Sequence, residues 1–129
     1  MGRLLWLFSF LLSPTLLAGY DGTNPVISAD ELLTNRDKYL VLDVRSNDEF
    51  AEGHIEGAVN IPHYAVLDHL EQFQAWQDKI IIVHCRSGKR AWKAEQMLMK
   101  QGISNLAHLE GDMLGWQKAK RPIVKPEQN

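Results

Sequence analysis

A single thiol and three cations stand together in six consecutive residues of this 129-residue chain. Cys85, the only cysteine, is followed by Arg86, Ser87, Gly88, Lys89 and Arg90. Positive charge beside a cysteine favours the thiolate, which is the nucleophilic form of this side chain. Arginine binds oxyanions through a planar set of N–H donors. The segment therefore predicts a cysteine nucleophile in a loop that binds an anion.

The loop stands between a predicted strand and a predicted helix. Residues 80–83 form a β-branched apolar run, which is typical of a strand buried on both faces. After the loop, apolar residues recur at helical spacing up to Leu98, and Gly102 indicates the end of the helix. Ligands of open α/β sheets bind at the carboxyl ends of strands, where helix N-termini face anions. Three cations near the N-terminus of the helix interact unfavourably with the helix dipole. We interpret this local conflict as a binding site for an anion.

The remaining chain predicts an α/β fold. Besides residues 79–84, three segments are predicted as strands, namely residues 39–44, 58–61 and 106–109. Ser28 with Glu31 predicts a capping box, and Ser46 or Asn47 predicts the cap of a one-turn helix through Phe50. Further helices are expected over residues 63–76 and 111–120. The alternation of strands and helices predicts a parallel sheet with helices on both faces.

Composition excludes several classes of protein. The net charge of −2 gives no global field for nucleic acid or acidic membranes. A lone cysteine excludes a dithiol redox mechanism and cysteine-based metal clusters. The five histidines show no metal-ligand spacing, so we expect neither a metal nor a cofactor. The length fits one domain, and the sequence does not indicate its oligomeric state.

The first 18 residues resemble a secretory signal peptide. Arg3 precedes an apolar run over residues 4–12, followed by Pro14 as a breaker and Ala18 as a small residue before the cleavage site. The apolar segment is shorter than the ~20 residues that a membrane span needs. We therefore expect cleavage near Ala18, a mature domain over residues 19–129 and a periplasmic or otherwise exported protein. An uncleaved N-terminal anchor is the alternative.

Four segments together resemble the rhodanese-like sulfurtransferases. Residues 85–90 are similar to the Cys-Arg-x-Gly-x-Arg/Thr active-site loop of that family. Residues 26–32 resemble its opening strand and helix, residues 42–62 its most recognisable stretch, and residues 109–122 its closing strand and short helix. The resemblance covers a core of about residues 25–124 and implies a central parallel five-stranded sheet. Asp112 stands where the family often has a second glycine, so we expect the rim of the pocket to differ from the family pattern.

The resemblance implies a sulfur transfer in two steps. Cys85 would take the outer sulfur of a small donor such as thiosulfate, hold it as a persulfide, and pass it to a thiol or cyanide acceptor. The backbone amides from Arg86 to Arg90 would surround the anion, and Arg86 and Arg90 would offset its charge. Lys89 either contributes or only faces solvent.

Two alternatives remain open. One is a non-enzymatic rhodanese-like module that binds a partner or carries sulfur; the intact Cys85 counts against it. The other is a cysteine-dependent phosphatase or arsenate reductase. Those enzymes use a Cys-x5-Arg loop, whereas Arg90 follows Cys85 in a Cys-x4-Arg spacing and position 91 is Ala. The shorter loop favours the sulfurtransferase.

Other polar and aromatic residues have structural interpretations. The resemblance implies that Asp43 ties loops together with Arg45. We expect His54 and His63 to hydrogen-bond the backbone, and His84 to be a strand-end histidine with its hydrogen bonds satisfied. The tryptophans at helix ends and faces are expected to pack rather than stack on ligands; they are Trp76, Trp92 and Trp116.

Overall fold

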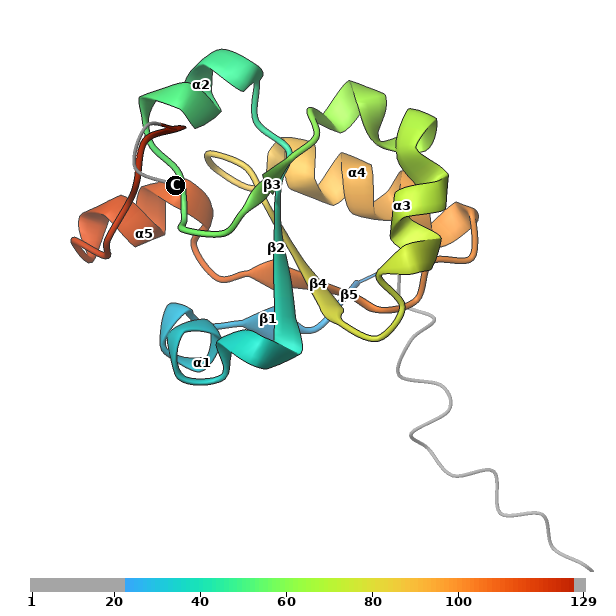
Figure 1. Cartoon of the computed structure of the whole chain (residues 1–129), viewed down its shortest axis with the longest axis horizontal. Coiled ribbons are helices and arrows are strands. Elements are labelled where there is room, and N and C mark those ends of the chain that lie inside the picture. Colours follow the sequence, from blue (N-terminus) through green and yellow to red (C-terminus); the bar gives the residue numbers. More distant parts are fainter. Residues whose placement is uncertain (1–22, 127–129) are drawn as a thin grey trace, which may run out of the picture.

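Five parallel strands form one sheet in a computed structural model that describes residues 23–126 (Figure 1). The strands are β1 (Val26–Ile27), β2 (Tyr39–Asp43), β3 (Val59–Asn60), β4 (Ile80–His84) and β5 (Leu106–Leu109), in the order β1-β5-β4-β2-β3. The four strands predicted from the pattern are confirmed, and β1 completes the five-stranded sheet. Because all pairings are parallel, the carboxyl ends of β2, β4 and β5 meet at one edge.

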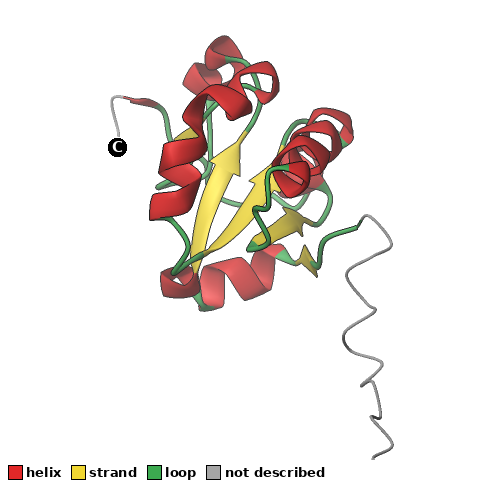
Figure 2. Ribbon diagram, turned by 90° about the vertical axis from the view of Figure 1, so that its right-hand side faces the viewer, coloured by secondary structure: helices red, strands yellow, loops and turns green. Residues whose placement is uncertain are grey.

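Helices cover both faces of the sheet, as predicted (Figure 2). The α-helices are α1 (Ala29–Thr34), α2 (Asn47–Glu52), α3 (Leu70–Ala75), α4 (Lys89–Lys100) and α5 (Asp112–Lys118). The 3₁₀ helices are η2 (Arg36–Lys38) and η3 (His63–His69). Figure 1 shows α3 and α4 on one side of the strands and α1 and α5 on the other.

Alternation along the strands builds two cores. Ile81 and Val83 of β4 pack with η3, α3 and α4, whereas Ile82 between them packs with α1 and α5. Successive side chains of a strand point to opposite faces, so a continuous apolar run supplies both cores. This explains why residues 80–83 contain no polar residue.

The helix ends match the sequence in part. At α2, Ser46 and Glu49 form a complete capping box. At α1, Ser28 accepts the Glu31 N–H, but the reciprocal bond is absent and that prediction is wrong. The Glu31 carboxylate instead accepts a hydrogen bond from the Tyr39 hydroxyl at 2.8 Å. The predicted helix over residues 63–76 is divided into η3 and α3, because His69, the last residue of η3, has a φ of −120°.

Candidate active site

The loop after β4 folds back on the Cys85 sulfur. The Gly88 N–H donates to Cys85 Sγ at 3.0 Å, and Gly88 caps α4 with a φ of 109°. This is a left-handed conformation that residues with a side chain rarely adopt. A Cβ at this position would also lie 3.0 Å from Asp112 Oδ2. Glycine at position 88 therefore allows the tight turn that directs an amide at the thiol.

The start of α5 fixes how the loop peptides are oriented. The Cys85 carbonyl accepts the Met113 N–H at 3.0 Å, and the Arg86 carbonyl accepts the Leu114 N–H at 3.1 Å. In a planar trans peptide the next N–H points opposite to the carbonyl. The N–H groups of Arg86 and Ser87 therefore point away from α5, and neither has a hydrogen-bond partner among residues 23–126. These amides are available to an anion.

The thiol lies beneath the loop. Cys85 is 1% exposed and belongs to the apolar cluster that includes Val44 and Ala91. By contrast, Arg86, Ser87 and Lys89 are exposed, and their side chains make no hydrogen bond or ion pair within the part of the chain described here. The structure thus brings together Cys85, Gly88 and the loop backbone, while these three side chains face solvent.

Arg90 is the cation that the structure places beside the sulfur, and Glu49 of α2 holds it. The guanidinium donates to both Glu49 oxygens, at 2.7 and 3.0 Å. This pair lowers the pKa of Glu49 to about 2. The pKa of Arg90 is raised, mainly by Glu49 and to a smaller extent by Cys85. In Figure 1 the loop after β4 lies between α2 and the start of α4. The Arg90 guanidinium therefore interacts with both the Glu49 carboxylate and the Cys85 sulfur.

One buried group of charges, the Asp43 cluster, consists of Asp43, Arg45 and His84. The Arg45 guanidinium donates to Asp43 at 2.6 Å and to the Gly53 carbonyl at 2.8 Å. Asn60 donates its amide to the carbonyls of Asp43 and Arg45. The cluster ties β2 to β3 and to the end of α2, as the resemblance implied for Asp43 and Arg45.

His84 differs from its prediction. The ring is fully buried, and Nδ1 donates to the Cys85 carbonyl at 3.1 Å. Nε2 has no hydrogen-bond partner in the described residues and lies 3.6 Å from Asp43 Oδ2. The prediction that His84 has its hydrogen bonds satisfied is therefore wrong for Nε2. The Asp43 carboxylate nearest to Nε2 is already bound by the Arg45 guanidinium. Burial lowers the pKa of His84.

A second group of charges, the Asp112 cluster, was not anticipated; it consists of the buried Glu95 and Asp112 and the half-buried His108. His108 Nδ1 lies 2.8 Å from Glu95 Oε2, and Nε2 lies 2.9 Å from Asp112 Oδ2. The two carboxylates raise the pKa of His108 to about 10. Asp112 Oδ1 also accepts the Cys85 N–H at 3.0 Å. The only sequence signal was Asp112 in place of a glycine.

The other expected structural residues divide into confirmed and wrong predictions. His54 Nδ1 donates to the Phe50 carbonyl at 2.8 Å, as expected. His63 makes no side-chain hydrogen bond in the described region; it lines a groove with Tyr64 between η3 and α4. Trp76 and Trp116 pack as predicted, whereas Trp92 is 57% exposed because its position on α4 faces away from both cores.

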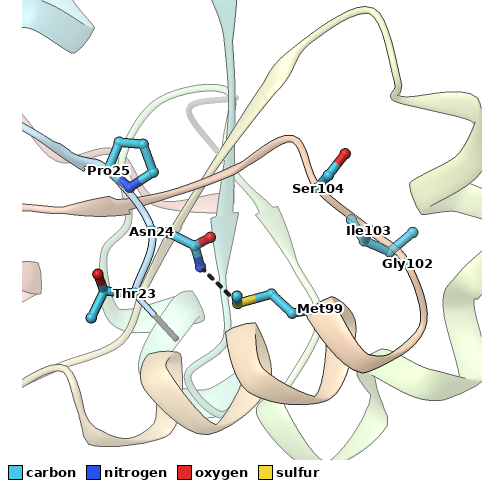
Figure 3. A pocket seen from close by; sticks show the side chains of 7 residues that line it. All are labelled: Thr23, Asn24, Pro25, Met99, Gly102, Ile103 and Ser104. Carbon is cyan, nitrogen blue, oxygen red and sulfur yellow. Dashed lines mark hydrogen bonds between the residues drawn. The ribbon is translucent and has the colours of Figure 1, made fainter. Parts of the chain in front are cut away.

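One cavity lies away from the loop after β4, and a groove lies next to it. The cavity in Figure 3 is lined by residues 23–25, Met99 and residues 102–104, and it contains none of the predicted site residues. A groove next to Gly88 is lined by Trp92, Glu95 and His108, among others. Within residues 23–126 no helix has the length and hydropathy to cross a membrane.

Comparisons with known proteins agree with this fold. The rhodanese-like domain family matches residues 28–119. A sulfurtransferase from Allochromatium vinosum is 30% identical over 78% of this chain and 92% of its own. A rhodanese-related protein from Thermoplasma volcanium superimposes with a TM-score of 0.69 at 31% identity, over 78% of this chain and 97% of that one.

A longer enzyme shares the same domain. The structure of a thiosulfate sulfurtransferase from Pseudomonas aeruginosa superimposes with a TM-score of 0.70 at 25% identity. The match covers 79% of this chain and 20% of that enzyme, so the likeness concerns one part of it. With a family match over most of the described residues and a cysteine loop at the carboxyl end of β4, the chain belongs to the rhodanese-like sulfurtransferase family.

Proposed function

We propose that this protein transfers sulfane sulfur from a small anionic donor such as thiosulfate to a thiol or cyanide acceptor through a persulfide on Cys85. The observation that carries the proposal is the Gly88 N–H directed at Cys85 Sγ at 3.0 Å, in a loop whose Arg86 and Ser87 amides have no partner among the described residues. Amides in this arrangement stabilise negative charge on sulfur. No cofactor is needed for this chemistry.

The reaction balances in two displacements. The Cys85 thiolate attacks the outer sulfur of thiosulfate, the S–S bond breaks, and sulfite leaves with the electron pair. Cys85 then carries one additional sulfur as a persulfide anion, which the loop amides stabilise. An acceptor thiolate attacks the outer sulfur, takes it as its own persulfide, and releases the Cys85 thiolate. Arg90 contributes positive charge in both steps, moderated by Glu49.

Because Cys85 is buried, uptake of sulfur distinguishes a reactive cysteine from an inert core cysteine. The protein is incubated with thiosulfate, desalted and measured by intact-protein mass spectrometry. We expect a mass gain of one sulfur atom on wild type and none on Cys85→Ala. Cys85→Ser is the matched control, because it keeps the shape of the side chain and the Gly88 contact. A folded wild type that gains no sulfur contradicts the proposal and indicates an inert core cysteine.

A binding or carrier module remains the alternative outcome. If wild type takes up sulfur but passes it to neither dithiothreitol nor cyanide faster than free persulfide reacts, the chain carries sulfur for a specific partner. Hydrolysis of an aryl phosphate by wild type, absent from Cys85→Ser, supports a phosphatase instead.

We further propose that the protein acts outside the cytoplasm. The support is the pattern of residues 1–18, which lie outside the described residues. Expression of the full chain in a bacterium, followed by fractionation and determination of the mature N-terminus, tests this proposal. Release into the periplasm with a new N-terminus near Gly19 is expected, and full-length protein in the cytoplasmic fraction contradicts it.

A further inference from the structure

Asp112 bonds one end of the turn that holds the candidate nucleophile and lies close to the other end. One oxygen, Oδ1, accepts the Cys85 N–H at 3.0 Å. The other, Oδ2, lies so close to Gly88 that a Cβ there would approach it to 3.0 Å. Gly88 is the residue whose N–H reaches Cys85 Sγ. The carboxylate thus braces the first and fourth residues of the loop from behind.

Asp112 is itself held in one orientation. Its Oδ2 bonds His108 Nε2 at 2.9 Å, and His108 Nδ1 bonds Glu95 at 2.8 Å. The second oxygen of Glu95 accepts the Asn24 amide at 2.9 Å. That amide also approaches the Met99 sulfur, as Figure 3 shows. Glu95 and Asp112 are 4% exposed, whereas His108 and Asn24 are half-buried, so the two carboxylates are the buried members of this chain of bonds.

The backbone at Asp112 indicates a constraint. Asp112 has a φ of 54°, directly after Gly111 with a φ of 75°. Residues with side chains avoid this region, and such strain persists where surrounding contacts over-determine it. Lys120 is the only other residue with a side chain in this region among residues 23–126, and it is exposed. At Asp112 the carboxylate contacts provide the compensation.

The charge of the Asp112 cluster argues against a role in activating the Cys85 thiol. Two carboxylates and one imidazolium leave a net charge of −1 behind Cys85, and a negative charge opposes a thiolate. The contacts are instead those of a brace that orients the loop amides. These two roles predict opposite effects when the carboxylate is removed.

We propose that Asp112, oriented by His108 and Glu95, is a positioning residue that holds the Cys85–Gly88 turn in the geometry needed for sulfur transfer. The inference rests on the proposed function, in which Cys85 is the sulfur-carrying residue. It assigns to residues on α4, β5 and α5 a role in the reaction although none of them needs to touch the donor.

Asp112→Gly is the main test, because glycine accepts the left-handed backbone and removes only the brace. We expect single-turnover sulfur uptake from thiosulfate, and alkylation of Cys85 by iodoacetamide, each to slow about tenfold, since small displacements of reacting groups have effects of at least this size. Lys120→Gly is the matched control: it makes the same backbone change at an exposed site and should leave both rates within about twofold of wild type.

Asp112→Asn separates geometry from charge. Its side-chain oxygen still accepts the Cys85 N–H, and its amide donates to a neutral His108, so both rates should stay within about threefold of wild type. Faster alkylation in both Asp112→Gly and Asp112→Asn overturns the proposal, because it identifies Asp112 as a bystander charge that opposes the thiolate. Unchanged rates in Asp112→Gly overturn it as well.

The alkylation measurement keeps the two proposals apart. A wild type that takes up no sulfur contradicts the proposed function, while slower alkylation of Asp112→Gly still supports the brace. If Asp112→Gly does not fold, His108→Asn replaces it, because asparagine preserves the bond to Glu95 but is too short to reach Asp112. Slower sulfur uptake and alkylation in His108→Asn support the brace, and wild-type rates overturn it.

Discussion

Two histidines beside Cys85, on neighbouring parallel strands, have opposite electrostatic environments. His84 ends β4 in the Asp43 cluster, and His108 lies on β5 in the Asp112 cluster. The pKa of His84 is lowered by burial, whereas two carboxylates at 2.8 and 2.9 Å raise the pKa of His108 to about 10. Both rings have an aspartate nearby, so the presence of a carboxylate does not decide the charge of the histidine.

The difference lies in what else the aspartate binds. Asp43 is occupied by the Arg45 guanidinium, and its Oδ2 is 3.6 Å from His84 Nε2, beyond hydrogen-bond distance. Among residues 23–126 Asp112 has no arginine partner, and its bonds go to His108 and to the Cys85 N–H. The Asp43 cluster therefore carries its positive charge on an arginine, and the Asp112 cluster carries it on a histidine. The first cluster braces the sheet, while the second is attached to the nucleophile loop.

The largest expected effect comes from breaking the Asp43 cluster. Arg45→Ala leaves the fully buried Asp43 carboxylate without its cation and the Gly53 carbonyl without its donor. Removal of one partner of a buried ion pair costs about 3–5 kcal/mol, and we expect a loss of this size in the free energy of unfolding from urea titration. The control is Arg121→Ala, which breaks a largely exposed pair with Asp30 and should cost about 1 kcal/mol or less. Equal effects of the two variants would contradict the comparison.

The same substitution at both histidines sharpens the contrast. His84→Asn keeps a donor near the Nδ1 position and removes a nitrogen that has no partner, so we expect a cost of about 1 kcal/mol. His108→Asn removes a cation that separates two buried carboxylates and should cost about 2–3 kcal/mol. Urea titrations at pH 7 measure both. A larger loss in His84→Asn would show that packing at the strand end outweighs the pairing of His108.

The pH dependence of stability gives a further contrast. The pKa of His108 is about 10 in the folded protein and near 6.5 in the unfolded chain, so the folded state binds the proton more tightly. This stabilisation is complete below pH 6.5 and is lost as the pH rises through 10. We expect the urea midpoint of wild type to fall over this range. In His108→Asn the same decline should be smaller, and an unchanged decline would assign it to other groups.

The sequence was sufficient for the strands and the loop because their signals are local. The apolar run over residues 80–83 and the cationic segment that follows Cys85 are contiguous in the chain. Gly102 also ends α4 with a φ of 83°, as expected for a glycine after a helix. The family resemblance added β1 and the pairing of Asp43 with Arg45, which are only two residues apart.

The clusters that surround the loop depend on contacts between distant segments. Glu49 and Arg90 are 41 positions apart, and Asp112 is 27 positions from Cys85. His108 reaches the loop only because β5 pairs with β4 in a register that sets it opposite Val83. No periodicity in the sequence specifies strand order or register at this level. The sequence predicted Ser46 or Asn47 as the cap of α2, but it gave no signal for the bonds that Glu49 makes to Ser46 and to Arg90.

The smallest expected effect lies on the acidic side and belongs to His84. Because the pKa of His84 is lowered in the folded protein, the unfolded chain binds more protons below pH 6.5, and stability falls as the pH decreases from 6.5. Glu49 begins to contribute only below its ordinary pKa of 4.5, since its folded pKa is about 2. The window between pH 6.5 and 4.5 therefore reports the histidines with a lowered pKa.

His63 shares this window, because burial and the nearby Arg90 and Lys93 also lower its pKa. The measurement is thus the difference between wild type and His84→Asn. We expect the urea midpoint of wild type to decrease from pH 6.5 to 4.5, and the decrease to be smaller in His84→Asn. If His84→Asn loses stability with the same slope as wild type, His84 keeps its proton in the folded protein. The histidines of the two clusters would then carry the same charge, which would contradict the contrast between the clusters.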